Sequence, residues 1–185
     1  MELASNFVKL IQDVVLHPTW TSAIALLVTS TLNELVALLP YNVILSGQTL
    51  FLQDAPSLSI FIKLSIFVVV PISIGATLGS LPSYGLAYFG GKPAIDKFSK
   101  YLKFSWDSVE RLKTKFKGTW YDEIIFLILR AVPFVPGLPV NILAGIIRMR
   151  PVPYLVLTLA GNIVDMLLLL IFFGFGAHWV TNLAQ

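Results

Sequence analysis

Long stretches without a single charged residue constrain this chain more than any other feature of its sequence. Five such stretches are 17 to 28 residues long: 14–33, 35–53, 64–91, 131–147 and 166–185. A helix needs about 20 predominantly apolar residues to cross the ~30 Å hydrocarbon core of a bilayer, so several of these stretches qualify. Only 12% of the 185 residues are charged, whereas soluble domains carry about 25% charged residues. The sequence therefore predicts an all-α polytopic membrane protein with a multi-pass location in the cell membrane.

Two of the apolar segments cannot be continuous straight helices. Residues 19–52 would form a helix about 51 Å long, well beyond the bilayer core, and Pro40 interrupts them. Residues 121–147 contain a cluster of helix breakers, and each half of about 12 residues would rise about 18 Å, enough to reach the midplane and turn back. We expect a re-entrant hairpin at 121–147, and at 19–52 either a similar hairpin or a span plus a half-span. The residues expected to break the two hairpins are Pro40 and Gly47 in the first, and Pro133, Pro136, Gly137, Pro139 and Gly145 in the second.

The two broken segments also resemble each other. PYNVILSG at 40–47 matches PVNILAG at 139–145, and each is followed by a proline-containing turn and a long apolar helix. Each is preceded by a segment with the apolar spacing of an amphipathic helix, at 2–16 and at 94–117. The order amphipathic helix, re-entrant hairpin and transmembrane helix thus occurs twice, although a coincidental match is the alternative.

One intervening crossing would invert the second copy relative to the first. We therefore expect a single membrane domain, 1–185, built from an inverted repeat whose halves are 1–91 and 92–185. Paired, proline- and glycine-interrupted segments in two inverted halves point to a transport site where the repeats meet.

Residues 92–117 form a basic section with eight Lys or Arg and three acidic residues. Their apolar residues fall on one helical face, which favours a basic amphipathic arm pressed on anionic headgroups over a solvated linker. The positive-inside rule places this arm in the cytoplasm. A re-entrant hairpin at 121–147 would return Arg148 and Arg150 to the same side.

Three charged residues, Glu34, Arg130 and Asp165, lie inside apolar segments. A charge at the bilayer centre costs about 2.5–3.5 kcal/mol on insertion scales, so such residues usually face a cavity or each other. Arg130 precedes the second break, where free backbone N–H groups and a helix N-terminus favour an anion, above all a phosphate. Glu34 precedes the first break and can pair with Arg130 or bind and release a proton.

Other interpretations of these residues stay open. Glu34 and Arg130 can be a purely structural pair, and Asp165 can hydrogen-bond the hairpin backbone. Asn42 and Asn141 can contact a substrate, although an asparagine beside a helix break more often caps free backbone.

The chain carries no motif of a membrane enzyme. It has no G-x-S-x-G, no H-E-x-x-H and no acidic cluster for a metal-dependent transferase. It has no cysteine, which excludes thiolate catalysis and zinc–thiolate sites. We expect a protein that is not an enzyme, with no catalytic residue, metal ligand or cofactor.

The second hairpin, LRAVPFVPGLPVNILAGIIRM at 129–149, resembles the signature of the DedA/VTT superfamily, also called SNARE-associated Golgi proteins. The residues that match it are Arg130, Pro133, Pro136, Asn141 and Gly145. Pro136 follows the VTT-like branch, because the DedA branch usually has a second arginine there. In the first half, Glu34, Pro40 and Gly47 match a looser pattern. The resemblance implies two facing re-entrant hairpins and lipid translocation.

We therefore expect transbilayer translocation of a phosphate-bearing lipid, with its headgroup held between the hairpins. The protein would be a polyprenyl-phosphate carrier flippase or a phospholipid scramblase. The expected substrate-binding residues are Arg130, Glu34, Asn141 and Asn42, and the expected proton-coupling residues are Glu34 and Asp165.

The expected partners are membrane lipids, either polyprenyl phosphate or phospholipid, together with protons and without nucleic acid. A homo-oligomer is compatible with the sequence. The alternative function is a non-transporting membrane scaffold that organises partners through the basic arm.

Overall fold

The computed structural model describes residues 19–36, 58–102, 120–133 and 135–183, and these residues form helices without any strand. The helices are α2 (Trp20–Val36), α4 (Leu58–Leu64), the π-helical segment η2 (Ser65–Val69), α5 (Val70–Leu102), α7 (Trp120–Ala131), α8 (Gly137–Ile146) and α9 (Pro151–Leu183). The prediction of an all-α chain is thus confirmed for this part of the protein. The amphipathic segment 2–16, the first break with Pro40, Asn42 and Gly47, and the arm residues 103–119 lie outside the described residues.

Two of the helical stretches are long and apolar enough to cross a membrane. They are Leu58–Gly91, which runs through α4, η2 and most of α5, and Pro151–Phe172, which forms most of α9. Gly91 ends the regular backbone of the first, with φ 55° and ψ −148°, a conformation that glycine adopts at little steric cost. The long apolar helix that the sequence predicts after the first broken segment is therefore confirmed, at 58–91. The long apolar helix expected after the second broken segment is α9, which begins at Pro151, a residue that is tolerated at the first position of a helix.

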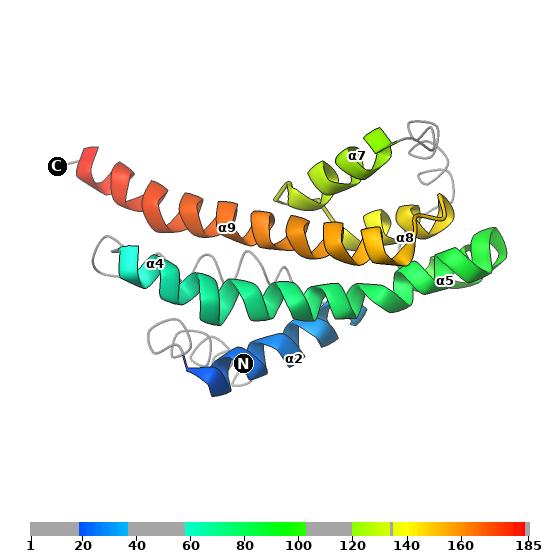
Figure 1. Cartoon of the computed structure of the whole chain (residues 1–185), viewed down its shortest axis with the longest axis horizontal. Coiled ribbons are helices and arrows are strands. Elements are labelled where there is room, and N and C mark those ends of the chain that lie inside the picture. Colours follow the sequence, from blue (N-terminus) through cyan, green and yellow to red (C-terminus); the bar gives the residue numbers. More distant parts are fainter. Residues whose placement is uncertain (1–18, 37–57, 103–119, 134, 184–185) are drawn as a thin grey trace.

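The central helix of the fold is α5. It contacts α2, α8 and α9, whereas α7 packs mainly on α9. Figure 1 shows α5 lying between α2 and α9, with α7 and α8 beside the half of α9 that begins at Pro151. The arrangement brings residues from both halves of the chain to the α5–α9 contact. The division into inverted repeats at 1–91 and 92–185 stays a prediction.

Two hydrophobic clusters hold these helices together. The first joins α2, α4, η2, α5 and α9 through Leu26, Leu64, Val68, Val69, Ile72, Met166, Leu169 and Leu170. The second joins α5, α7, α8 and α9 through Tyr84, Phe126, Val140, Ala144, Met149 and Tyr154. Within the second cluster, the rings of Tyr84 and Tyr154 stack with centroids 3.9 Å apart. The Tyr84 hydroxyl also donates to the Met149 carbonyl at 2.6 Å, which ties α5 to the turn before α9.

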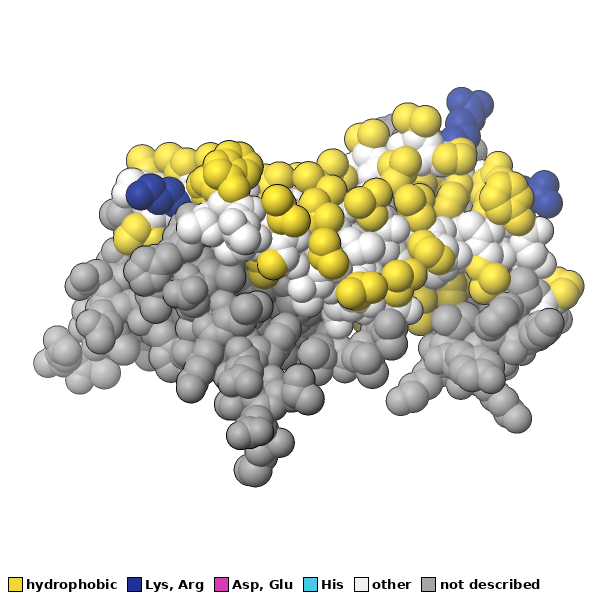
Figure 2. Space-filling view, turned by 90° about the horizontal axis from the view of Figure 1, so that it is seen from below, with side chains coloured by type: hydrophobic (Ala, Val, Ile, Leu, Met, Phe, Trp, Pro, Cys, Tyr) yellow, Lys and Arg dark blue, Asp and Glu magenta, His cyan; other side chains and the backbone are white. Residues whose placement is uncertain are grey.

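The outer surface is apolar as well. Figure 2 shows hydrophobic side chains spread over the described part of one face, with Lys and Arg side chains only towards its edges. On α2, Ile24, Val28 and Leu32 are at least half exposed and recur every four residues, so they form one outward stripe. An apolar stripe on the outside of a helical protein fits contact with lipid chains.

Glycines on α5 allow α2 to approach closely. A Cβ built on Gly75 would overlap Ser30 and the Leu27 carbonyl, and one built on Gly79 would lie 2.5 Å from the Thr31 carbonyl oxygen. The spacing Gly75-x-x-x-Gly79 is typical of such helix contacts in membranes, and here both glycines lie at the contact with α2.

Replacing Gly79 by alanine is expected to lower the Tm of the detergent-solubilised protein. The new Cβ would also lie 2.8 Å from the Glu34 Cβ, so α2 must shift away from α5, and such overpacking costs about 1–3 kcal/mol. Gly85→Ala on the same helix is the matched control, since its Cβ meets nothing within 4 Å. We expect this control to keep or slightly raise the Tm, because alanine is the better helix former. Equal Tm values for the two variants, measured by circular dichroism, would contradict the close α2–α5 contact.

Candidate functional site

The helix break between α7 and α8 builds one side of the candidate site. Pro133 and Pro136 lie in the break, and Pro136 has an extended backbone with φ −61° and ψ 126°. Gly137 begins α8, and Pro139 lies in its first turn, where a missing N–H breaks no intrahelical bond. The predicted interruption of the helix is confirmed. The path of the two short helices in the bilayer, as a re-entrant hairpin, stays a prediction.

Gly145 has a different position from the one that the sequence predicts. It lies inside α8 rather than in the break. A Cβ on Gly145 would lie 2.5 Å from the Tyr84 carbonyl oxygen and 2.6 Å from the Ala87 Cβ. The lack of a side chain therefore lets α8 pack closely against α5, and that packing accounts for a glycine at this position.

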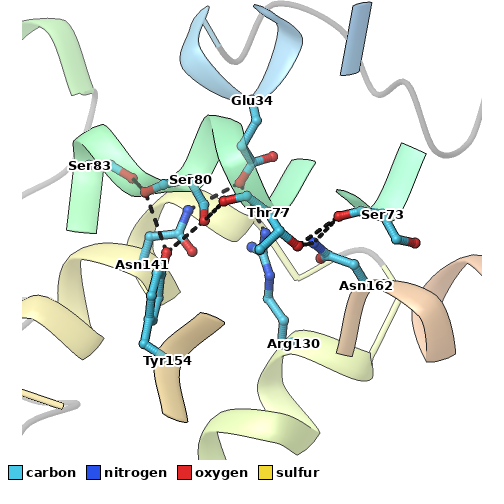
Figure 3. Close-up of polar contacts among 9 residues, drawn as sticks. All are labelled: Glu34, Ser73, Thr77, Ser80, Ser83, Arg130, Asn141, Tyr154 and Asn162. Carbon is cyan, nitrogen blue, oxygen red and sulfur yellow. Dashed lines mark hydrogen bonds and ion pairs between the residues drawn. The ribbon is translucent and has the colours of Figure 1, made fainter. Parts of the chain in front are cut away.

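The centre of the site is an ion pair between α2 and α7. Arg130 Nη2 lies 3.2 Å from Glu34 Oε1, and the Arg130 side chain is only 5% exposed. The side-chain amide of Asn141, on α8, donates to the same carboxylate oxygen at 3.1 Å. Figure 3 shows Glu34 reaching from α2 towards Arg130 and Asn141. The structure thus brings together three residues that the sequence singled out, as far as 107 positions apart.

A pocket of about 60 Å³ lies beside this pair. A single water needs only about 10–15 Å³ of such space, so the pocket has room for several waters or one phosphate-sized group. Its lining residues are Glu34, Ile72, Ser73, Ala76, Arg130, Val135, Gly137, Asn162, Asp165 and Met166. Asp165, a predicted site residue, is thus in the same pocket as Glu34 and Arg130. Asn141 is not among the lining residues and contacts the site through Glu34.

Two glycines make room for the Arg130 side chain. A Cβ on Gly137 would overlap the guanidinium group and lie 2.8 Å from Glu34 Oε1. A Cβ on Gly161, in α9, would lie 2.7 Å from both the Cβ and the Cγ of Arg130. The sequence predicts Gly137 only as a break residue and gives no role to Gly161. In the structure both positions determine where the guanidinium can lie.

The sequence reasoning missed a line of polar contacts between α5 and α9, which we call the polar seam. It consists of Ser73, Thr77 and Ser80 on α5 and Tyr154 and Asn162 on α9 (Figure 3). Asn162 Nδ2 donates to Thr77 Oγ1 at 3.1 Å, and the Tyr154 hydroxyl donates to Ser80 Oγ at 2.8 Å. The sequence does contain a signal for these residues. Ser73, Thr77 and Ser80 are spaced by four and three residues, and Tyr154 and Asn162 by eight, so each set falls on one face of its helix.

The arrangement can attract an anion. Arg130 supplies a forked set of donors, and α8 begins at the pocket with no side chain capping its N-terminus. The free N–H groups and the dipole at a helix N-terminus favour negative charge. In this structure the negative charge of Glu34 neutralises the positive charge of Arg130. Among the described residues, no group of three or more His, Cys, Asp or Glu is placed to hold a metal ion.

Comparison with known proteins gives the family. The model of the VTT domain matches residues 55–175. Undecaprenyl phosphate transporter A of Bacillus subtilis (strain 168) is 30% identical over 115 residues, which are 60% of this chain and 56% of that protein. The chain therefore matches little more than half the length of this relative, and no solved structure is detectably similar to it. Since the family model covers well over half of the chain and includes the break between α7 and α8, the protein belongs to the VTT domain family, within the DedA/VTT superfamily.

Proposed function

We propose that this protein moves a phosphate-bearing lipid from one leaflet of the membrane to the other. The observation that carries the proposal is the buried Arg130, which lines a phosphate-sized pocket at the start of α8. A relative whose name describes undecaprenyl phosphate transport supports the same class of substrate. The lipid chains would stay on the apolar outer surface while the headgroup passes the pocket.

Arg130 would hold the phosphate. One of its terminal nitrogens contacts Glu34, and its Nε is buried without a hydrogen-bond partner among the described residues. A guanidinium with unused N–H donors can donate to a phosphate oxygen without first breaking all of its existing contacts. The phosphate would then compete with the Glu34 carboxylate for the same cation.

Glu34 would alternate between pairing with Arg130 and accepting a proton. Asn141 donates to the Glu34 carboxylate at 3.1 Å, and this hydrogen bond would keep the carboxylate beside the pocket when a phosphate occupies Arg130. Protonation of Glu34 would remove its competition for Arg130, and Asp165 in the same lining would assist as a second proton acceptor. In this mechanism Asn141 positions Glu34, whereas Asn42 stays a proposed substrate contact outside the described residues.

The basic arm at 92–117 would lie on the cytoplasmic surface and draw anionic lipids towards the pocket. The two re-entrant hairpins would hold the headgroup near the middle of the membrane. When the inverted halves rock against each other, this site would be reachable from either leaflet.

A transfer assay with the purified protein as the sole protein component tests the proposal. Vesicles with wild-type protein are expected to transfer labelled polyprenyl phosphate or phospholipid between leaflets much faster than protein-free vesicles. A scaffold acting through the arm would give no acceleration, because its partners are missing. Imposing a pH gradient or a membrane potential separates the two transport modes, since a carrier flippase responds to one of them and a scramblase equilibrates lipids without either.

A further inference from the structure

We propose that the Ser73 hydroxyl, on α5, is a second hydrogen-bond donor to the headgroup phosphate. It would act in the pocket that Arg130 lines from α7. This inference rests on the proposed function and adds a residue that neither the family signature nor the sequence reasoning includes. Ser73 lines the pocket together with Arg130, Gly137 and Asn162. The two donors would therefore come from helices in different halves of the chain.

The Ser73 side chain is fully buried, and its Oγ has no hydrogen-bond partner among the described residues. Its neighbours on the same helical stretch behave differently. The hydroxyls of Ser65, Thr77, Ser80 and Ser83 each donate to a backbone carbonyl three or four residues earlier, at 2.7–2.9 Å. Buried hydroxyls nearly always have a partner, so the free donor of Ser73 indicates a polar group that binds in the pocket.

The polar seam fixes Ser73 in place. The Ser73 carbonyl accepts a hydrogen bond from Thr77 Oγ1 at 2.7 Å and from Asn162 Nδ2 at 3.4 Å. The second of these bonds joins α5 to α9 at the pocket. Because these bonds hold the Ser73 backbone, less conformational freedom is lost when its hydroxyl binds a ligand, which favours recognition.

The charges of the pocket explain why a neutral donor is useful there. Arg130 is the positively charged lining residue, and Glu34 and Asp165 are acidic. A hydroxyl strengthens phosphate binding without a second cation that the carboxylates would capture. A phosphate presents oxygens in several directions and can therefore accept from donors on two different helices, whereas a planar carboxylate on a guanidinium uses both oxygens on one side.

A binding measurement on the full-length protein in detergent tests this inference. The probe is farnesyl phosphate, with farnesol as the matched ligand that lacks the phosphate. Ser73→Ala is expected to weaken farnesyl phosphate binding about tenfold, the lower end of what a hydrogen bond to a charged group contributes, and to leave farnesol binding unchanged. Ser73→Cys, of similar volume and with a weaker donor, is expected to fall between alanine and wild type.

Ser83→Ala is the control, because it removes a hydroxyl from the same helix outside the pocket lining. It is expected to bind both ligands like wild type. The Tm of Ser73→Ala is expected to stay at or above the wild-type value, since the variant removes a buried hydroxyl without a partner.

The outcomes separate this inference from the proposed function. If Ser73→Ala binds farnesyl phosphate like wild type while Arg130→Ala does not, the role of Ser73 is wrong and the proposed function stands. If Ser73→Ala weakens farnesyl phosphate and farnesol equally, its effect is on packing and the inference is overturned. If Arg130→Ala also binds like wild type, the pocket is not the phosphate site and both proposals fall.

Discussion

Vesicles that contain Arg130→Ala are expected to transfer labelled polyprenyl phosphate at least about tenfold more slowly than vesicles with the wild-type protein. The change removes the forked donor of the pocket, and the half-buried Glu34 carboxylate keeps its hydrogen bond from Asn141. Hydrogen bonds to charged groups contribute about 1.5–3 kcal/mol, and each 1.4 kcal/mol corresponds to about tenfold. The initial rate of transfer at limiting lipid concentration measures the effect.

Two further variants show whether the effect belongs to the site. Arg150→Ala removes an exposed arginine that immediately precedes α9 and is expected to transfer lipid at nearly the wild-type rate. Arg130→Lys keeps the charge without the planar fork and is expected to give an intermediate rate. Equal rates for Arg130→Ala and wild type would contradict the role of Arg130.

The second large effect is expected from Gly137→Ala. The added Cβ would overlap the Arg130 guanidinium and lie 2.8 Å from Glu34 Oε1, so the guanidinium must leave its present position. The end of an arginine side chain can move at little cost, and alanine is a better helix former than glycine. We therefore expect about a tenfold loss of transfer, from loss of a charge-assisted contact, with almost no change in Tm.

Gly85→Ala serves as control for this variant too, because it adds the same methyl group where nothing lies within 4 Å. It should keep both transfer and Tm. A Gly137→Ala protein that transfers lipid at the wild-type rate would show that the position of Arg130 beside Glu34 is unimportant. A large fall in its Tm would instead indicate a role in folding.

The charged residues of the site could be predicted because charge is costly in an apolar segment. Glu34, Arg130 and Asp165 stood out for this reason alone, and the structure places all three around one pocket. The break between α7 and α8 was predictable from Pro133 and Pro136, because proline removes a donor and clashes with the preceding turn.

Other parts of the site depend on which helices meet, and a single sequence does not give that. The spacing of Ser73, Thr77 and Ser80 marks a polar face on α5, but only the fold shows that Asn162 and Tyr154 on α9 are its partners. Likewise, Gly161 has a role only because α9 passes beside Arg130, and Gly145 only because α8 packs on α5.

Locating a bound polyprenyl phosphate in an experimentally determined structure would show whether the lipid phosphate binds at Arg130. We expect phosphate density inside the pocket, within hydrogen-bond distance of the Arg130 guanidinium and the Ser73 hydroxyl, with Glu34 displaced from Arg130 and still close to Asn141. Phosphate density on the basic arm at 92–117, with the Glu34–Arg130 pair intact, would contradict it.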